Sequence, residues 1–381
     1  MTQPLTKAAT RPGTETVLRV RGLRTHFALD DGVVKAVDGV DLDIVRGQTL
    51  AVVGESGCGK SVMARSILRL VDRPGRITGG EIWVSRPPDG ETDLVSADER
   101  TLRKVRGKRI GMVFQEPMTS MSPMHTLGNQ IGEAIVLHER VTKKEARKRT
   151  IDLLGRVGIP APERRVDEYP FQMSGGMLQR AMIAMALSCN PELLIADEPT
   201  TALDVTTQAQ ILDLLRSLQQ DFGMAVMLIT HDLGVAAQMA DQVAVMYLGA
   251  VVERGDVVSV FRTPRHPYTK ALLRSIPKLG ARSRERLTPV RGMVPHAYRR
   301  PAGCSFHPRC DEFMPGRCDV TEPGATPGPE PGREVRCLRY ESQNAANAAN
   351  AANAANAANA ANDANGAEPP ADDSRDERGR A

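Results

Sequence analysis

The stretch Gly54-Glu55-Ser56-Gly57-Cys58-Gly59-Lys60-Ser61 decides the fold of this 381-residue chain. It fits the pattern G-x-x-x-x-G-K-[ST], in which glycines let the backbone curl so that several N–H groups point at one phosphate chain. Lys60 is placed to reach β- and γ-phosphates, and the Ser61 hydroxyl to ligate Mg²⁺. The apolar run 49–53 predicts a buried strand before this loop, and residues 62–68 predict a helix after it. The sequence therefore predicts a phosphate site at a helix N-terminus.

Composition and charge describe a globular chain without a dominant electrostatic character. It has 50 basic and 46 acidic residues, and the net charge of +4 gives no reason to expect nucleic acid as a partner. Residues 1–15 lack the apolar core of a secretory signal, and the longest apolar run, 243–252, is too short to span a bilayer. We therefore expect a cytoplasmic protein whose membrane role, if any, comes through partners. Six cysteines in such a chain argue for metal, catalysis or plain burial over structural disulfides.

The segments around the phosphate loop predict an α/β fold with an antiparallel layer. Residues 17–45 alternate apolar and polar side chains, which is typical of antiparallel strands. Phe27 lies in this layer, where its ring either stacks on a purine or is half-buried in the strand. A strand at 109–115 ends on Gln115, and residues 127–157 read as helical with a charged, solvated face. Residues 73–107 read as loops with a strand at 81–84.

Three further motifs follow the helical region in chain order. Ser174-Gly175-Gly176 opens a small-residue helix, and such a turn is a second possible anion site. The apolar strand 192–198 ends on Asp197, suited to hold Mg²⁺, and Glu198, placed to polarise an attacking water. The strand 224–230 delivers His231 to the edge of the sheet where ligands bind in parallel α/β folds.

Taken in order, these motifs resemble the ATP-binding cassette of ABC transporters over about residues 17–255. The resemblance implies a P-loop fold with a mixed sheet, an antiparallel β layer and a helical subdomain. It also implies that two cassettes face head to tail, with each ATP between one subunit's phosphate loop and the other's Ser-Gly-Gly turn. Gln115 would then sense Mg²⁺ and the membrane subunit, Asp204 would belong to the D-loop, and Phe27 would stack on adenine. Met177 stands where the family usually has glutamine, and we expect the γ-phosphate contact to survive that change.

The resemblance assigns site residues one by one. The expected nucleotide contacts are Phe27, Gly54, Glu55, Ser56, Gly57, Cys58, Gly59, Lys60, Ser61, Val62, Gln115, Ser174, Gly175, Gly176 and Asp204. The expected catalytic residues are Glu198, His231 and Gln115, and the expected Mg²⁺ ligands are Ser61, Gln115 and Asp197. ATP and Mg²⁺ are the implied cofactors.

A narrower resemblance points to a subfamily. Residues 198–211, 231–236 and 263–273, together with Met177, look like the ATPases of oligopeptide, dipeptide and nickel importers. The partners this implies are two membrane permeases, an extracytoplasmic solute-binding protein and a second ATPase, at the cytoplasmic face of the membrane. Nickel or another small solute is the alternative cargo. A soluble cassette ATPase acting on DNA or ribosomes is a second alternative, and a redox sensor on a cassette scaffold a third.

Four cysteines gather near the C-terminal end: Cys304, Cys310, Cys318 and Cys337, with the spacing C-x5-C-x7-C-x18-C. Four thiols in a loop-rich segment that cannot build its own core suggest a metal or cluster. The spacing fits neither a zinc ribbon nor common ferredoxin runs, and His307 could replace one thiol in a zinc site. The block 303–310 resembles the C-terminal module of peptide-importer ATPases, some of which hold a [4Fe–4S] cluster, and that cluster is our expectation.

The predicted organisation has four parts. Residues 1–16 are expected to be disordered, 17–260 to form the cassette with a helical insert at 116–172, and 261–340 to form the cysteine-containing module. Residues 341–381 carry a period-three Ala-Ala-Asn tract followed by a charged end. With almost no large apolar residue, this tail is predicted to be disordered.

Overall fold

A computed structural model describes residues 15–86, 90–201, 203–276, 289–296 and 298–341 of the chain. The segments predicted to be disordered, 1–16 and 341–381, lie almost wholly outside these ranges. Where they overlap, the prediction is wrong by one or two residues. Glu15 forms an ion pair with Arg46 at 2.8 Å, a strand begins at Thr16, and Glu341 accepts a hydrogen bond of 2.8 Å from the Gly324 amide.

The predicted antiparallel layer is present as a four-stranded sheet in the order β2-β1-β4-β5. Its strands are β1 (Thr16–Leu29), β2 (Gly32–Val45), β4 (Gly75–Arg86) and β5 (Gly90–Asp93). The alternating pattern of β1 and β2 places one face of the layer over the core that also receives the first helix. β4 is longer than the predicted strand 81–84, because it pairs with β1 along most of its length.

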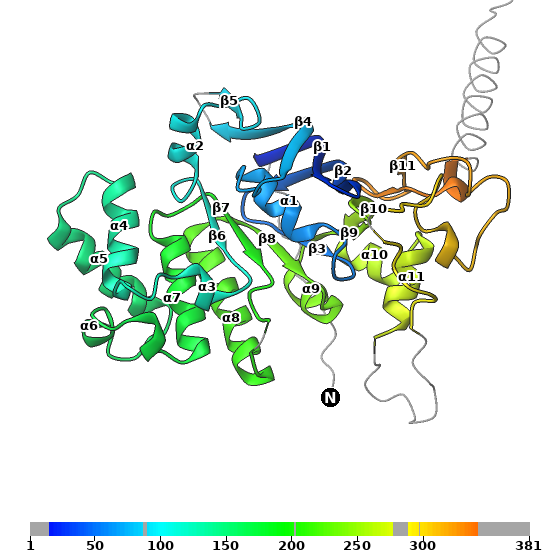
Figure 1. The fold of residues 1–381 in the computed structure, drawn as a ribbon. Helices are drawn as coiled ribbons and strands as arrows, with labels where there is room; N and C mark the ends of the chain where they lie inside the picture. The colour runs from blue at the N-terminus through cyan, green and yellow to red at the C-terminus, as the bar shows by residue number, and fades with distance from the viewer. Residues whose placement is uncertain (1–14, 87–89, 202, 277–288, 297, 342–381) are drawn as a thin grey trace, which may run out of the picture.

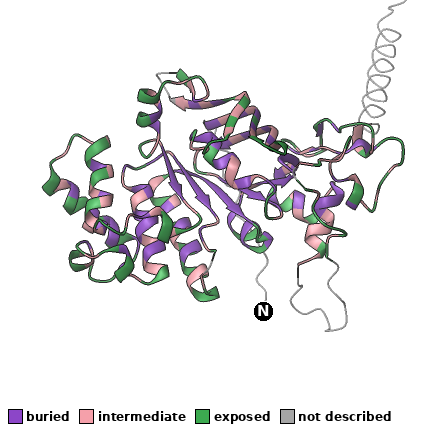
Figure 2. Ribbon diagram, viewed as in Figure 1, coloured by how far each residue is buried: buried purple, intermediate pink, exposed green. Residues whose placement is uncertain are grey.

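The second sheet has eight strands in the order β11-β12-β10-β9-β3-β8-β7-β6. Five of them, β6, β7, β8, β3 and β9, run parallel, so their carboxyl ends meet at one edge. Figure 2 shows these strands as the most continuously buried part of the molecule. The strands span Thr49–Val53 (β3), Ile110–Val113 (β6), Leu193–Asp197 (β7), Ala225–Thr230 (β8), Gln242–Tyr247 (β9), Ala250–Asp256 (β10), Thr326–Pro327 (β11) and Glu334–Val335 (β12).

Helices flank the mixed sheet at both ends (Figure 1). Those beyond β6 and β7 form a separate apolar core with the sheet's outer strands, which explains the helical pattern read between 127 and 157. A break at 139–142 divides that region into two helices. The helices are α1 (Lys60–Ile67), α2 (Glu99–Val105), α3 (Pro117–Ser120), α4 (Leu127–His138), α5 (Lys143–Arg156), α6 (Pro162–Arg165), η1 (Pro170–Gln172), α7 (Gly175–Leu187), α8 (Val205–Phe222), α9 (Leu233–Met239), α10 (Val257–Arg262), α11 (Pro267–Arg274) and η2 (His307–Arg309).

The C-terminal segment is continuous with the mixed sheet. β12 pairs with β10, and the buried Arg333 binds the buried Glu253 at 2.9 Å across that junction. Three aromatic rings, of Tyr247, Tyr268 and Phe306, then pack with centroids 4.7 to 5.3 Å apart. The segment predicted as a separate module is thus held to the end of β9, close to the phosphate loop. Within the described ranges, none of the helices is both long enough and apolar enough to cross a membrane.

Candidate functional site

The phosphate loop connects β3 to α1 with a backbone that requires glycine. Gly59 is the N-cap of α1 at φ 102°, and a Cβ there would come within 2.1 Å of the Ala36 carbonyl oxygen. A Cβ on Gly54, at φ 155°, would come within 2.3 Å of the Met246 carbonyl oxygen. Both neighbours are backbone and cannot move aside. The loop is therefore wedged between β2 and β9, which fixes its N–H groups for a ligand.

Lys60 is held by the loop that it follows. Its side chain is 5% exposed, and its Nζ donates to the carbonyl oxygens of Gly54 at 2.8 Å and Glu55 at 3.2 Å. The ammonium thus lies inside the curve of the loop, where the sequence motif predicts the phosphates to bind. Burial of such a charge is costly unless donors are satisfied, and a bound polyphosphate supplies stronger acceptors than two carbonyls.

A pair of hard oxygen ligands lies beside the loop. Ser61 donates its hydroxyl to Asp197 Oδ1 at 2.9 Å, and the Asp197 carboxylate is 1% exposed. Burial raises the pKa of Asp197, and the negative charge of Glu198 adds to that rise while the Ser61 hydrogen bond opposes it. A buried carboxylate next to a hydroxyl is a donor set that suits Mg²⁺, whose charge would reverse the cost of ionising Asp197. The predicted Mg²⁺ residues Ser61 and Asp197 therefore meet in space.

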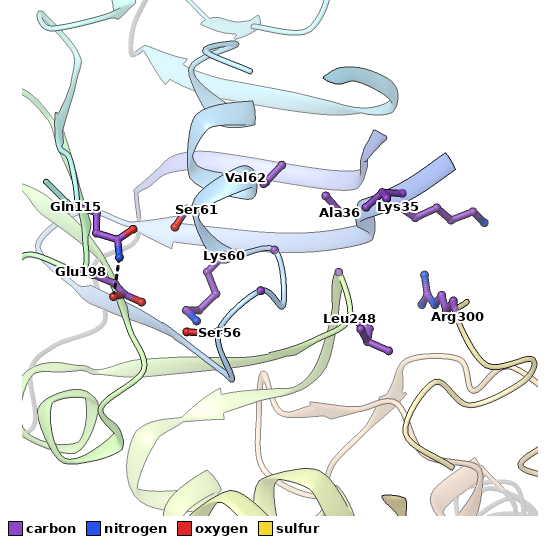
Figure 3. A pocket seen from close by; sticks show the side chains of 14 residues that line it. Lys35, Ala36, Ser56, Lys60, Ser61, Val62, Gln115, Glu198, Leu248 and Arg300 are labelled. Atoms are coloured by element: carbon purple, nitrogen blue, oxygen red, sulfur yellow. Dashed lines mark hydrogen bonds between the residues drawn. The ribbon is translucent and has the colours of Figure 1, made fainter. Parts of the chain in front are cut away.

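Glu198 is the point at which three other side chains converge. Its Oε2 accepts from Gln115 Nε2 at 3.2 Å and from the Thr201 hydroxyl at 2.9 Å, and His231 Nδ1 lies 3.3 Å away. Gln115, Glu198 and His231 follow β6, β7 and β8, so the common edge of the parallel strands brings them together. Glu198 also adopts a φ of 47°, which is strained for a glutamate and is typical of functional positions. Figure 3 shows Gln115 and Glu198 together at one end of the pocket.

The Ser-Gly-Gly turn and Asp204 lie outside this pocket. Ser174 caps α7, with its hydroxyl accepting from the Met177 amide at 3.4 Å. Asp204 caps α8, accepting from the Thr207 amide at 3.0 Å and hydroxyl at 2.7 Å, and these bonds lower the pKa of Asp204. A Cβ on Gly176 would come within 2.9 Å of the Thr207 methyl group, so the two caps lie against each other. The N-termini of α7 and α8 therefore lie side by side, and neither lines the pocket.

The pocket itself has a volume of about 230 Å³ and extends from Glu198 to the C-terminal segment. Of the predicted contacts, Ser56, Gly57, Gly59, Lys60, Ser61, Val62 and Gln115 line it. The side chains of Glu55 and Cys58 turn into the protein, which leaves only their backbone for a ligand. Six lining residues were not predicted: Val34, Lys35, Ala36, Leu248, Gly249 and Arg300.

Phe27 does not line the pocket, although its pairing partner in β2, Val34, does. Its ring lies over Gly75 instead, since a Cβ on Gly75 would come within 2.5 Å of Phe27 Cε1. Directly paired residues share a face of the sheet, so Phe27 stands beside the pocket without entering it. Its role in adenine stacking stays a prediction.

Comparison with known proteins now decides the family. A profile described as ABC transporter matches residues 37–201, and one described as Oligopeptide/dipeptide transporter, C-terminal region, matches 252–318. The chain is 50% identical over 332 residues to a putative peptide import ATP-binding protein of Brucella ovis, covering 85% of this chain and 97% of the relative. It is 47% identical to the dipeptide transport ATP-binding protein DppD of Escherichia coli, covering 84% of this chain and 96% of the relative. The chain belongs to the ABC transporter ATP-binding proteins.

Solved structures agree with the fold. A dimeric ATP-binding cassette bound to ADP and Pi in a post-hydrolysis state matches with a TM-score of 0.56 and 29% identity, covering 63% of this chain and 98% of that one. The predicted cassette fold and ATPase class are thereby confirmed.

In this ABC ATPase the C-terminal segment reaches the phosphate loop directly. Arg309 Nη1 and Nη2 bind the two carboxylate oxygens of Glu55 at 2.7 and 2.9 Å, and the Arg309 side chain is 3% exposed. The Glu55 amide donates to the Tyr268 hydroxyl at 2.9 Å. Charge-assisted, bidentate pairs are the stronger class of hydrogen bond. The second residue of the loop is therefore held from both its backbone and its side chain, and no motif in the sequence signals this link.

The four predicted cysteines of the ABC ATPase line one small pocket with His266, Phe306 and His307. Burial raises the pKa of Cys304, raises that of Cys310 to about 12 and raises that of Cys337 to about 11, with neighbouring thiols adding to each rise. Across the described ranges, however, no three His, Cys, Asp or Glu side chains are placed to hold one metal ion. The thiols converge on a pocket without the close packing that a single ion needs.

Proposed function

We propose that the chain is the ATP-hydrolysing subunit that energises import of di- or oligopeptides across the cytoplasmic membrane. The observation that carries this proposal is the coexistence of two features in one chain. Residues 252–318 match the oligopeptide/dipeptide transporter C-terminal region, and Gln115 and His231 both contact Glu198, the residue suited to activate water. Relatives of nearly full length are named for peptide and dipeptide transport, which supports the same cargo.

Each residue near the phosphates has a role that its geometry suits. The loop amides and Lys60 bind the β- and γ-phosphates, and Ser61 and Asp197 ligate Mg²⁺. Glu198 orients a water for in-line attack on the γ-phosphorus and accepts its proton, and the products are ADP and phosphate. Gln115 and His231 contact Glu198 Oε2, and with ATP bound Gln115 would ligate Mg²⁺ while His231 would contact the γ-phosphate.

The site is complete only with a second cassette. Ser174, Gly175 and Gly176 do not line the pocket of their own chain, so they are free to cover the ATP of a partner cassette. Closure over ATP and reopening after hydrolysis then move the permeases through the helices of residues 116–172. The partners that follow are two integral membrane permeases, an extracytoplasmic solute-binding protein and a second, non-identical ATPase. With those partners, the chain would work at the cytoplasmic face of the membrane as a peripheral subunit.

The four cysteines form a further part of the proposal, a [4Fe–4S] cluster held by Cys304, Cys310, Cys318 and Cys337. The four thiols line one pocket, which supports a ligand that they share. The resemblance of residues 303–310 to modules that hold such a cluster supports iron and sulfide over zinc. Burial disfavours ionisation of these thiols, and the iron ions of such a cluster would compensate the charge of the thiolates. Anaerobic purification with iron, sulfide and zinc analysis tests it: about four irons per chain are expected, and stoichiometric zinc or no metal would overturn it.

The test of function is affinity purification of the Glu198→Gln chain from detergent-solubilised cells with ATP present. The trapped closed state should retain its partners longest. Two multi-spanning membrane proteins and a second cassette ATPase are expected in the eluate. Wild-type chain with ADP is the control, because it should retain the second ATPase least. Recovery of ribosomal proteins or nucleic acid without permeases would refute transport. Recovery of a nickel-binding partner protein would revise only the assigned solute, from peptides to nickel.

A further inference from the structure

The end of the nucleotide pocket far from Glu198 is built by three distant parts of the chain. Val34, Lys35 and Ala36 come from β2, Leu248 and Gly249 from the turn between β9 and β10, and Arg300 from the C-terminal segment. Figure 3 shows Arg300 across the pocket from Ser61, Gln115 and Glu198. Since Lys60 and Ser61 fix the phosphate end, the adenosine part of ATP must extend toward this second end. Arg300 is the one guanidinium among the lining residues that the structure describes.

Arg300 is held in place by neighbours on two sides. Its Nη1 lies 2.5 Å from Asp38 Oδ2, and its Nε donates to the Ser305 hydroxyl at 2.9 Å. The side chain is 21% exposed, which is low for an arginine at the mouth of a pocket. Two hydrogen bonds orient the plane of the guanidinium, so little further ordering is needed when a ligand arrives.

The place of Arg300 in the pocket argues for a contact with adenosine, because it lies across from Ser61 and Glu198 at the phosphate end. Its charge is compensated only in part: Asp38, which pairs with Arg300, is shared with Arg24 at 3.5 Å and Lys35 at 3.8 Å, and Glu322 Oε1 lies 3.9 Å from Arg300 Nη2. A planar, weakly hydrated guanidinium stacks well on the face of a purine, and that interaction needs no free charge.

We propose that Arg300 contacts the adenosine part of bound ATP, so that the C-terminal segment takes part in nucleotide recognition. The contact adds a residue from outside the cassette motifs to the ATP site. It also means that a change in the position of the C-terminal segment should alter the affinity for ATP. The inference rests on the proposed ATP site and does not depend on which solute is imported. A negative result for Arg300 would therefore leave the proposal of peptide import unchanged.

The experiment compares ATP with inorganic tripolyphosphate as ligands of the full-length chain. Binding is measured by equilibrium competition against labelled ATP in the Glu198→Gln background, which prevents turnover. Arg300→Ala is expected to weaken ATP about fivefold to twentyfold, the range of a desolvated cation–π contact, and to leave tripolyphosphate within about twofold. Equal losses for both ligands, or no loss for ATP, would overturn the proposal.

Three variants distinguish a direct contact of Arg300 with ATP from a role in which Arg300 only holds the C-terminal segment in place. Arg299→Ala removes an exposed neighbouring arginine and should change neither affinity. Asp38→Asn removes the ion pair but keeps Arg300, so ATP should bind at least as tightly as before. If Arg300 served only to dock the C-terminal segment through this ion pair, Asp38→Asn would weaken ATP binding as much as Arg300→Ala. Arg300→Lys keeps the charge without the plane and should recover only part of the ATP affinity. If Arg300→Ala does not fold, Arg300→Lys carries the same comparison, with the melting temperature of the nucleotide-free chain as the check on docking.

Discussion

The two ends of the nucleotide pocket are built in different ways. At the phosphate end every side chain lies in a short motif at the end of a parallel strand, so chain order alone places Gln115, Glu198 and His231 together. At the adenosine end the residues come from β2, the β9–β10 turn and residue 300, and no motif connects them. The residues of hydrolysis are therefore set locally in this fold, whereas on our proposal the affinity for nucleotide depends on how the C-terminal segment docks.

The sharpest test of the phosphate end is Glu198→Gln. The variant keeps the shape of the side chain but cannot accept a proton, so kcat for ATP should fall by about 10²–10⁴ while ATP affinity is retained. Steady-state ATPase assays and equilibrium binding measure the two quantities. Glu163→Gln, at an exposed helix position, is the matched control and should behave as wild type. Hydrolysis at the wild-type rate would remove Glu198 from its assigned role.

Asp197→Asn should have opposite effects on stability and on activity. Burial raises the pKa of Asp197, so the folded chain gains stability below the ordinary carboxylate pKa and loses it as the pH rises through the raised value. At neutral pH without Mg²⁺, the neutral asparagine should therefore unfold no more easily than wild type, or be more stable by about 1 kcal/mol. With Mg²⁺ and ATP, it should lose the ligand and about tenfold to a hundredfold of activity.

The measurements are melting curves between pH 5 and 8 with and without Mg²⁺, alongside ATPase assays. Ser61→Ala serves as the comparison, because it removes the 2.9 Å hydrogen bond that favours the charged form. It should weaken Mg²⁺ binding without the gain in metal-free stability. A metal-free Asp197→Asn chain that is clearly destabilised at neutral pH would contradict the assignment of a buried, reluctantly ionised carboxylate.

A third prediction concerns the link between the two regions, the ion pair of Arg309 with Glu55. Arg309→Met removes a side chain that is 3% exposed and leaves the Glu55 carboxylate without its bidentate partner. We expect unfolding to become easier by about 1–3 kcal/mol, and ATP to bind several-fold more weakly because the loop loses a support. Denaturant unfolding and ATP binding measure the two effects.

The double variant Glu55→Gln/Arg309→Met checks that the pair acts as a unit. It should recover part of the stability lost in Arg309→Met, because the uncompensated charge is gone. Lys270→Met, which breaks the more exposed pair with Glu312, is the control and should cost less. Full additivity of Glu55→Gln and Arg309→Met would show that the contact does not couple the segment to the loop.

Much of the fold and the phosphate end follow from sequence because their signals are local. Glycines at 54 and 59, an apolar strand before Asp197, and alternation in 17–45 each specify a backbone within a few residues. The adenosine end and the Arg309–Glu55 pair join residues more than 200 positions apart, so spacing carries no information about them. The C-terminal segment also reads as separate, yet β12 pairs with β10, and two-residue strands leave no pattern to detect.

The smallest expected effect belongs to Met177, the position where the family usually has glutamine. Met177 is partly buried and packs against the helical core, whereas the Ser174 hydroxyl caps α7 just before it. Met177→Gln should therefore lower the stability slightly and change kcat by less than about threefold. Ser174→Ala should have the larger effect, because it removes a helix cap worth about 1 kcal/mol together with the expected contact to the partner's phosphate. Both are measured as ATPase rates of the assembled transporter, since the turn acts on the partner's ATP. A large gain in rate from Met177→Gln would mean that the methionine limits hydrolysis, which its packing against the helical core gives no reason to expect.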